Sequence, residues 1–238
     1  MELAIAYDNR PADEGYLSGW GFACLVDGRV LFDTGEDYPP LRENIGLMKR
    51  DLSGLESVVL SHRHWDHTGG LEGLLRELDS EINVYGCSDT ESSLKRMIES
   101  YGSNFMEADG LREVSSGIYS TGQIEGDYKN SSMLEQSLVV RAGEGLAVVT
   151  GCSHPGIVNI IERVGELFPG ERILLVVGGF HLGAAGREEV FSIARKLREM
   201  GVEKVAPAHC TGEEAISIFE EVYGDDFISA GAGKVLEI

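Results

Sequence analysis

The stretch that decides the fold of this 238-residue chain is SHRHWDH (61–67), which directly follows a short apolar run typical of a buried strand. Imidazole and carboxylate groups are the ligands that zinc-like ions prefer. Residues two apart in an extended segment point the same way, so His62 and His64 are predicted to share one metal ion. Asp66 and His67 would then turn toward a second metal position nearby. Two such ions, about 3.5–4 Å apart, hold a hydroxide and clamp a substrate oxyanion.

The remaining histidines lie where other strands are predicted to end. The chain has six histidines, and the three outside this stretch are His154, His181 and His209. Each closely follows an apolar run of strand length: LAVVT, ILLVV and KVAPA, respectively. A lone histidine at a strand end is ordinarily structural. Ligands of open α/β sheets gather at the carboxyl edge of the strands, however, so this placement of every histidine predicts one shared site.

These motifs resemble those of the metallo-β-lactamase superfamily. HRHWDH matches the HxHxDH signature of that family, and LFDTG (31–35) is similar to its first motif, a strand ending in a supporting aspartate. His209 in PAHCTG resembles the family's late histidine on the second metal. The resemblance covers most of the chain and implies an α/β fold, a four-layer αββα sandwich with metals at one edge. Since no linker or low-complexity tract interrupts the sequence, we expect one domain over residues 1–238.

A further set of motifs narrows the resemblance to one subgroup. In chain order they are YDN (7–9), GWGF (19–22), LFDTG, SHRHWDH, EQSL (135–138), TGCSHPGIVN (150–159), GGFHL (178–182) and AHCTG (208–212). The subgroup is named for a methanopterin-pathway synthase, which joins a dihydropterin-methyl diphosphate to a ribofuranosyl-aminobenzene phosphate. Many similar chains are described only as metal-dependent hydrolases, so the name is a weak guide to substrate. Asp8 and Asn9 are expected to serve the same sheet edge.

The resemblance implies two divalent metal ions, with zinc expected and iron, manganese or magnesium as alternatives. The predicted ligands are His62, His64, Asp66, His67, His154 and His209. The chain departs from the family pattern after LAVVT, because Gly-Cys-Ser-His stands where Gly-Asp is usual. The bridging aspartate is therefore absent, and His154, Cys152 or Glu135 must replace it. We favour His154 over Cys152, since cysteine is also a common small buried residue.

Other residues are assigned to the surroundings of the metals. Asp33 is predicted to be an outer carboxylate, because metal-bound histidines need such a partner to fix their tautomer. Asp66 and His181 are the predicted catalytic residues. His181 is surplus to the metal ligands and is expected to face substrate as acid, base or phosphate partner, the alternative being that it merely ends its strand. Gly151 and Gly179 are predicted to let substrate approach the backbone.

Composition limits the partners. Forty acidic and 20 basic residues give a net charge of −20, which disfavours nucleic acid because its binders usually carry a basic face. A small phosphorylated substrate is compatible, since bound metals reverse the field within a pocket. No apolar run approaches the roughly 20 residues that span a membrane. Four scattered cysteines favour the reducing cytoplasm. The sequence leaves the oligomeric state open.

Two chemistries fit these predictions, and the ligands alone do not separate them. One is hydrolysis of a phosphorylated small molecule, and the other is a transfer in which an arylamine displaces diphosphate. A di-iron oxidoreductase on the same fold is the alternative, but such sites typically carry HxExDH, with a carboxylate where this chain has His64. Residues 102–136, rich in glycine, serine and acidic groups, are predicted to be irregular and to cover substrate.

Overall fold

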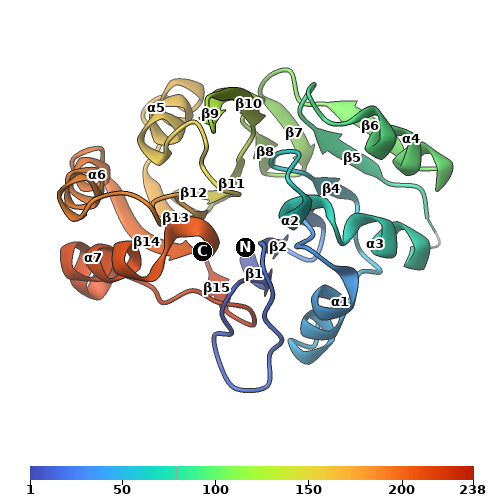
Figure 1. The fold of residues 1–238 in the computed structure, drawn as a ribbon, viewed down its shortest axis with the longest axis horizontal. Coiled ribbons are helices and arrows are strands. Elements are labelled where there is room, and N and C mark those ends of the chain that lie inside the picture. Colours follow the sequence, from blue (N-terminus) through green and yellow to red (C-terminus); the bar gives the residue numbers. More distant parts are fainter. Residues whose placement is uncertain (79) are drawn as a thin grey trace.

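The computed structural model describes residues 1–78 and 80–238, which form two main sheets and a separate hairpin (Figure 1). Across the first sheet lie β15 (Val235–Glu237), β1 (Glu2–Tyr7), β2 (Ala23–Val26), β3 (Val30–Phe32), β4 (Ser57–Val59), β5 (Asn83–Gly86) and β6 (Asn104–Glu107). Across the second lie β14 (Val202–Ala208), β13 (Ile173–Gly179), β12 (Gly145–Thr150), β11 (Leu138–Ala142), β8 (Ile118–Ser120) and β7 (Arg112–Ser115). The hairpin consists of β9 (Ile124–Tyr128) and β10 (Ser131–Glu135).

Helices follow the parallel strands of both sheets. The first half contains α1 (Tyr38–Leu47), α2 (Trp65–Thr68), α3 (Leu71–Glu77) and α4 (Ser92–Ser100). The second half contains α5 (Ile157–Leu167), α6 (Arg187–Glu199) and α7 (Glu213–Tyr223), with short 3-10 turns η1 (His209–Thr211) and η2 (Gly224–Asp226). Among the helices of residues 1–78 and 80–238, none combines the length and apolar character needed to cross a membrane.

The buried apolar residues define four layers. Side chains of both sheets, such as Phe32 and Val149, pack together in the central cluster. A second cluster joins the outer face of the first sheet to α1, α3 and α4. A third joins the second sheet to α5, α6 and α7, and contains Phe219. The helices therefore cover the outer faces while the sheets face each other, which confirms the predicted αββα sandwich (Figure 1).

Residues 102–136 are more regular than predicted. They contain β6, β7, β8 and the β9–β10 hairpin, whose tip is Lys129-Asn130 with φ of 52° and 62°. Two left-handed residues at the tip fit a tight turn that matches the twist of the strands. The prediction of an irregular segment was wrong, because short strands that alternate exposed polar side chains give little apolar pattern.

Sharp turns at strand ends bring the chemistry to one edge. Asp33, Ser153, His181 and His209 are not glycines, yet they have φ of 58°, 65°, 54° and 48°. Each lies within three residues of the end of β3, β12, β13 or β14. Left-handed backbone at such residues is uncommon and concentrates at functional sites. The turns direct side chains from both sheets toward the same edge.

Candidate metal centre

Three histidines form the first candidate subsite. His62 and His64 lie in the loop after β4, and His154 lies in the loop after β12. One ring nitrogen from each lies within 4.8 Å of the others. The His62 Nε2 and His64 Nδ1 atoms are 2.9 Å apart. The structure thus brings together the alternating pair of the signature with a histidine about 90 residues later in the chain, in the arrangement that an all-nitrogen metal site requires.

Asp66, His67 and His209 form the second candidate subsite. Asp66 and His67 are neighbours on α2, and His209 begins η1 after β14. One potential ligand atom from each lies within 4.8 Å of the others. Asp66 Oδ2 is 3.8 Å from His67 Nε2 and 3.5 Å from His209 Nε2. Every residue predicted to bind metal is therefore in one of the two subsites, although the binding itself stays a prediction.

A buried carboxylate orients the rings of the signature. Asp33 Oδ2 lies 2.7 Å from His67 Nδ1 and accepts from Ser61 Oγ at 2.7 Å, while its Oδ1 accepts from Ser61 N at 2.6 Å. Ser61 Oγ lies 2.8 Å from His62 Nδ1. Both rings thus use Nδ1 for an outer contact, which leaves Nε2 for a metal. The position predicted for Asp33, behind the ligands rather than among them, matches these bonds.

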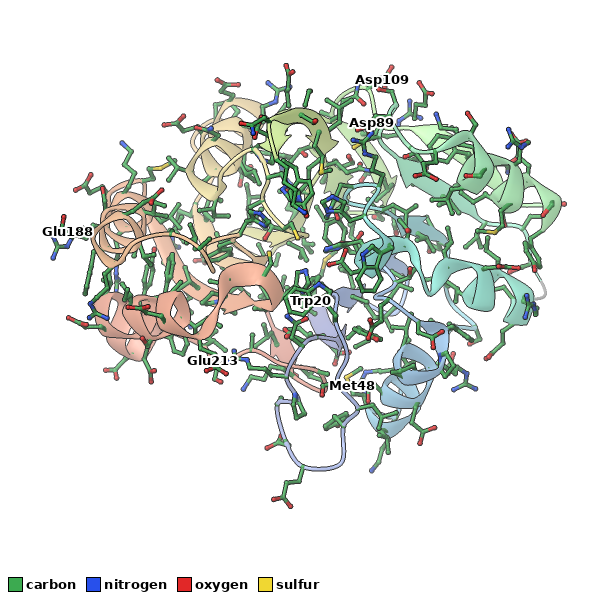
Figure 2. The ribbon with its side chains drawn as sticks, viewed as in Figure 1. Trp20, Met48, Asp89, Asp109, Glu188 and Glu213 are labelled. Atoms are coloured by element: carbon green, nitrogen blue, oxygen red, sulfur yellow. The ribbon has the colours of Figure 1, made fainter. Side chains whose placement is uncertain are left out.

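Asn9 plays the same part for the second subsite. Its Oδ1 lies 2.9 Å from His209 Nδ1, its amide donates to the His209 carbonyl at 3.2 Å, and Gly21 N donates to Oδ1 at 3.0 Å. His209 therefore also presents Nε2 to the centre. The sequence predicts that Asn9 serves this edge but does not identify its partner, because the two residues are 200 positions apart in the chain. Trp20, near the centre of the view in Figure 2, packs edge-on to the His209 ring at 5.6 Å.

Glu135 was considered as a replacement ligand, and the structure gives its carboxylate another role. The side chain is buried at the end of β10. Its Oε1 accepts from Cys152 N at 2.9 Å and Ser153 N at 2.8 Å, and its Oε2 accepts from His154 N at 2.7 Å. Burial raises its pKa to about 6, against those three donors. Glu135 thus holds the 152–154 loop in place instead of pointing at a metal.

The atoms left without partners fit a pair of cations. Among the described residues, His154 Nδ1 and Nε2 and His209 Nε2 are buried and make no hydrogen bond. Burial and neighbouring imidazoles lower the pKa of His154 to about 3 and that of His62 well below its usual value, which keeps both rings neutral as metal ligands require. Burial opposes charge on His67 too, but the Asp33 carboxylate outweighs it and raises the pKa to about 9. A metal would displace that proton.

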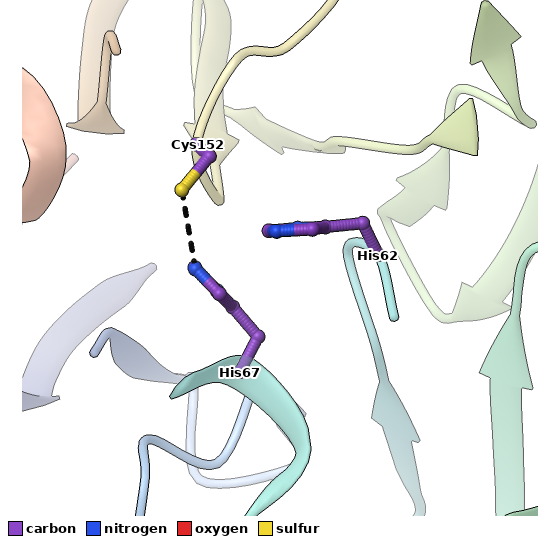
Figure 3. A group of neighbouring side chains, drawn as sticks. All are labelled: His62, His67 and Cys152. Atoms are coloured by element: carbon purple, nitrogen blue, oxygen red, sulfur yellow. Dashed lines mark hydrogen bonds between the residues drawn. The ribbon is translucent and has the colours of Figure 1, made fainter. Parts of the chain in front are cut away.

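Cys152 lies between the subsites. Its Sγ is 3.3 Å from His67 Nε2, and His62 faces the same sulfur (Figure 3). The sequence predicts that either His154 or Cys152 fills the position of the missing aspartate, with His154 favoured. The structure brings both to the centre in different places, with His154 in the first subsite and Cys152 beside both.

His181 lies at the outer rim of the centre. It is exposed, and its ring centroid is 4.4 Å from that of His154. Tyr128, at the end of β9, packs edge-on to His64 at 4.5 Å and to His154 at 5.2 Å, so the hairpin covers the first subsite. The sequence alone does not reveal Tyr128, because nothing in the segment EGDYKN marks its position over the first subsite.

The glycines predicted to admit substrate have a packing role. A Cβ on Gly151 would lie 2.2 Å from Ser61 Oγ and 3.1 Å from Asp33 Oδ2. A Cβ on Gly179 would lie 2.3 Å from the Gly151 carbonyl oxygen and 2.7 Å from Cys210 Sγ. Protein atoms, rather than a ligand, occupy the space that a side chain would need. This packing explains why glycine stands at both positions, and the substrate contact predicted for Gly151 and Gly179 stays a prediction.

Two hollows flank the centre. One, of about 550 Å³, lies beside the first subsite between α2, α3 and α4, and its lining includes Arg63, His64, Trp65 and Met97. The other, of about 300 Å³, reaches His154 and His181 on the opposite side. The exposed Trp65 ring offers a stacking surface next to the ligands, and the Arg63 guanidinium beside it lies 3.5 Å from the Asp89 carboxylate.

Comparisons with known proteins agree on the family. A β-lactamase superfamily domain profile matches residues 28–115. The 7,8-dihydropterin-6-methyl-4-(β-D-ribofuranosyl)-aminobenzene-5'-phosphate synthase of Methanocaldococcus jannaschii is 29% identical, over 98% of this chain and 95% of its own length. A diphosphatase of the PhnP family shares the fold, with 14% identity, a TM-score of 0.62, and coverage of 100% of this chain and 97% of its own.

A nearer solved structure decides the assignment. It is the crystal structure of Tm1679, a metal-dependent hydrolase of the β-lactamase superfamily, with 32% identity and a TM-score of 0.83. The alignment covers 100% of this chain and 99% of that one. An identity of this size over both full lengths, joined to the αββα fold and the intact HxHxDH signature, leaves one conclusion. The chain belongs to the metallo-β-lactamase superfamily.

Proposed function

We propose that this protein is an enzyme that uses two divalent metal ions to act on a phosphorylated small molecule. The observation that carries the proposal is the pair of adjacent three-residue subsites, whose buried nitrogens His154 Nε2 and His209 Nε2 make no hydrogen bond among the described residues. One ion would be held by His62, His64 and His154. The other would be held by Asp66, His67 and His209. Nitrogen-rich sets of this kind favour zinc.

The chain's own residues divide the remaining work. Bound divalent ions at this centre would supply an activated water and a clamp for phosphate oxygens. Asp33 and Asn9 orient the ligand rings from behind. Tyr128 covers the first subsite and excludes water from that side. His181, exposed at the rim and outside both subsites, is placed to donate to a phosphate or to protonate a leaving group.

The reaction itself is either hydrolysis or transfer. The name of the Methanocaldococcus jannaschii relative supports a synthase acting on a dihydropterin and an aminobenzene phosphate. The hydrolase description of Tm1679 supports the other reading. The hollow beside Trp65 suits a planar ring, and bound metal ions would suit phosphate groups. A substrate that carries both a planar ring and a phosphate therefore fits the site in either reaction.

One assay separates these reactions. Purified protein is incubated with pterin-methyl diphosphate, with and without an arylamine acceptor, and inorganic diphosphate and phosphate are measured. Diphosphate release that requires the arylamine identifies a transferase, whereas release without it identifies a hydrolase. Protein that binds fewer than two metal ions per chain and turns over none of a panel of phosphoesters and diphosphates would refute the proposed function.

A di-iron oxidoreductase is the second candidate, and the first subsite argues against it. That subsite consists of three imidazoles, with His64 where such oxidoreductases would place a carboxylate. Carboxylate ligands favour the harder, redox-active iron, whereas an all-imidazole set suits zinc. Metal analysis of protein expressed in medium with equal zinc and iron distinguishes the two, because the oxidoreductase requires bound iron and consumes oxygen.

A further inference from the structure

Cys152 occupies the most central position of the candidate metal centre. Its sulfur lies within 4.8 Å of a ligand atom of His62 and His154 from the first subsite, and of His67 and His209 from the second. Figure 3 shows the sulfur facing His67 and His62 from the opposite side of the centre. Among the described cysteines, Cys152 alone belongs to ligand groups that include members of both subsites.

The surrounding structure fixes this sulfur in place. Gly151 before it packs against Ser61 and Asp33 with no room for a side chain. The backbone N–H of Cys152 donates to the buried Glu135 carboxylate, as do those of the next two residues. The side chain is only 3% exposed. A residue held this firmly between two sets of ligands has a defined place in the centre, rather than filling space in the core.

The position also matches the departure from the family sequence pattern. Cys152 follows Gly151 where, as the resemblance implies, the family has Gly-Asp with a carboxylate that joins the two metals. The described ligand groups include no second carboxylate besides Asp66. A thiolate has several lone pairs on one sulfur, so it can bind two ions at once as a carboxylate does with two oxygens.

We propose that the Cys152 thiolate is a ligand shared by both metal ions, in place of the bridging carboxylate. The inference rests on the proposed two-metal function. On loading, the S–H bond breaks, the proton passes to solvent, and two sulfur lone pairs form the bonds to the ions. No oxidant is needed. A soft shared ligand makes the centre selective for zinc, iron or cobalt over magnesium and manganese, which prefer oxygen.

Cys210 provides a matched control. It is also close to the centre, with its Sγ 3.6 Å from the Cys152 carbonyl oxygen, and it groups with Cys152 and His209. It joins no described group that contains His62, His64 or His154. Cys210 therefore reaches one subsite at most, and its removal should leave a shared ligand intact.

The test uses the full-length protein, stripped of metal and titrated with Co²⁺. Thiolate ligation gives Co²⁺ a charge-transfer absorption in the near ultraviolet that nitrogen and oxygen ligands do not give. When the two subsites fill one after the other, a shared thiolate makes this absorption grow over both equivalents, whereas a thiolate on one ion makes it grow over one equivalent only. The wild type should show growth through both equivalents, and so should Cys210→Ser. Cys152→Ser should lose the band, release about one proton fewer on loading, and bind both ions at least tenfold more weakly.

The variant Cys152→Asp distinguishes the loss of a metal ligand from the loss of the folded structure. It restores the family's usual carboxylate, so it should bind two Co²⁺ ions without the near-ultraviolet band. A wild-type band that is absent, or that grows over one equivalent only, overturns the inference of a shared ligand. If that protein still binds two ions, the proposed two-metal function stands. A band that survives Cys152→Ser and disappears in Cys210→Ser also overturns it. Wild-type protein that binds fewer than two ions refutes the proposed function, and the shared ligand with it.

Discussion

Replacing Glu135 tests whether one buried carboxylate supports the loop that carries Cys152 and His154. Glu135→Ala leaves three buried backbone N–H groups, those of residues 152–154, without an acceptor. Each unsatisfied buried donor costs about 1–3 kcal/mol. Water that enters the space of the removed side chain offsets part of this, so we expect a loss of roughly 3–5 kcal/mol in the free energy of unfolding.

A conservative variant gives a graded result. Glu135→Gln keeps one oxygen, which can still accept from two of the three donors, but its NH₂ group faces the third donor. We expect it to lose about 1–3 kcal/mol, the cost of one unsatisfied donor. Glu125→Ala, on the exposed face of the same hairpin, is the matched control and should change the free energy of unfolding by no more than about 0.5 kcal/mol.

The assay is urea denaturation of metal-free protein in the presence of a chelator, so that metal binding does not contribute. With an m-value of about 3 kcal/mol/M, the expected loss in Glu135→Ala lowers the unfolding midpoint by about 1–1.7 M. Hydrogen exchange should also become faster at residues 152–154. A midpoint for Glu135→Ala equal to that of Glu125→Ala, with unchanged exchange in the loop, would show that these bonds do not hold the loop.

Three further variants address the site directly. His64→Ala should bind less than one metal ion in the first subsite, because the subsite loses one of its three imidazoles; unchanged stoichiometry by elemental analysis would remove His64 from the ligands. Asn9→Ala should weaken metal binding at the second subsite by about 10–100-fold, because His209 loses the partner that orients its ring, and a competition titration with a chelator measures this. His181→Ala should keep both ions and lose about 10²–10⁴-fold in turnover if it transfers a proton. Metal content and turnover measured on one preparation check this, and loss of metal would make His181 a ligand instead.

Local features of the sequence were enough to predict the fold of this protein and to place its candidate metal ligands. The HxHxDH spacing lies within six residues, where the alternation of an extended segment already fixes which side chains point together. The histidines at 154, 181 and 209 follow apolar strands, and parallel strands of one sheet end at a common edge. Both features depend only on the chain near each residue, so the sequence alone contains them.

Only the tertiary structure decided which distant segments of the chain contact one another at that edge. The contacts of Asn9 with His209, of Glu135 with the 152–154 loop, and of Tyr128 with His64 join parts of the chain that no local pattern relates. The tertiary structure also decides the positions of His154 and Cys152. The two are separated by one residue and both are suitable ligands, but only packing against Glu135 and Gly151 determines that one side chain faces the first subsite and the other lies between the two subsites. Hydrogen-bond partners of buried groups depend on where the whole fold places a donor or acceptor, and sequence spacing does not contain that information.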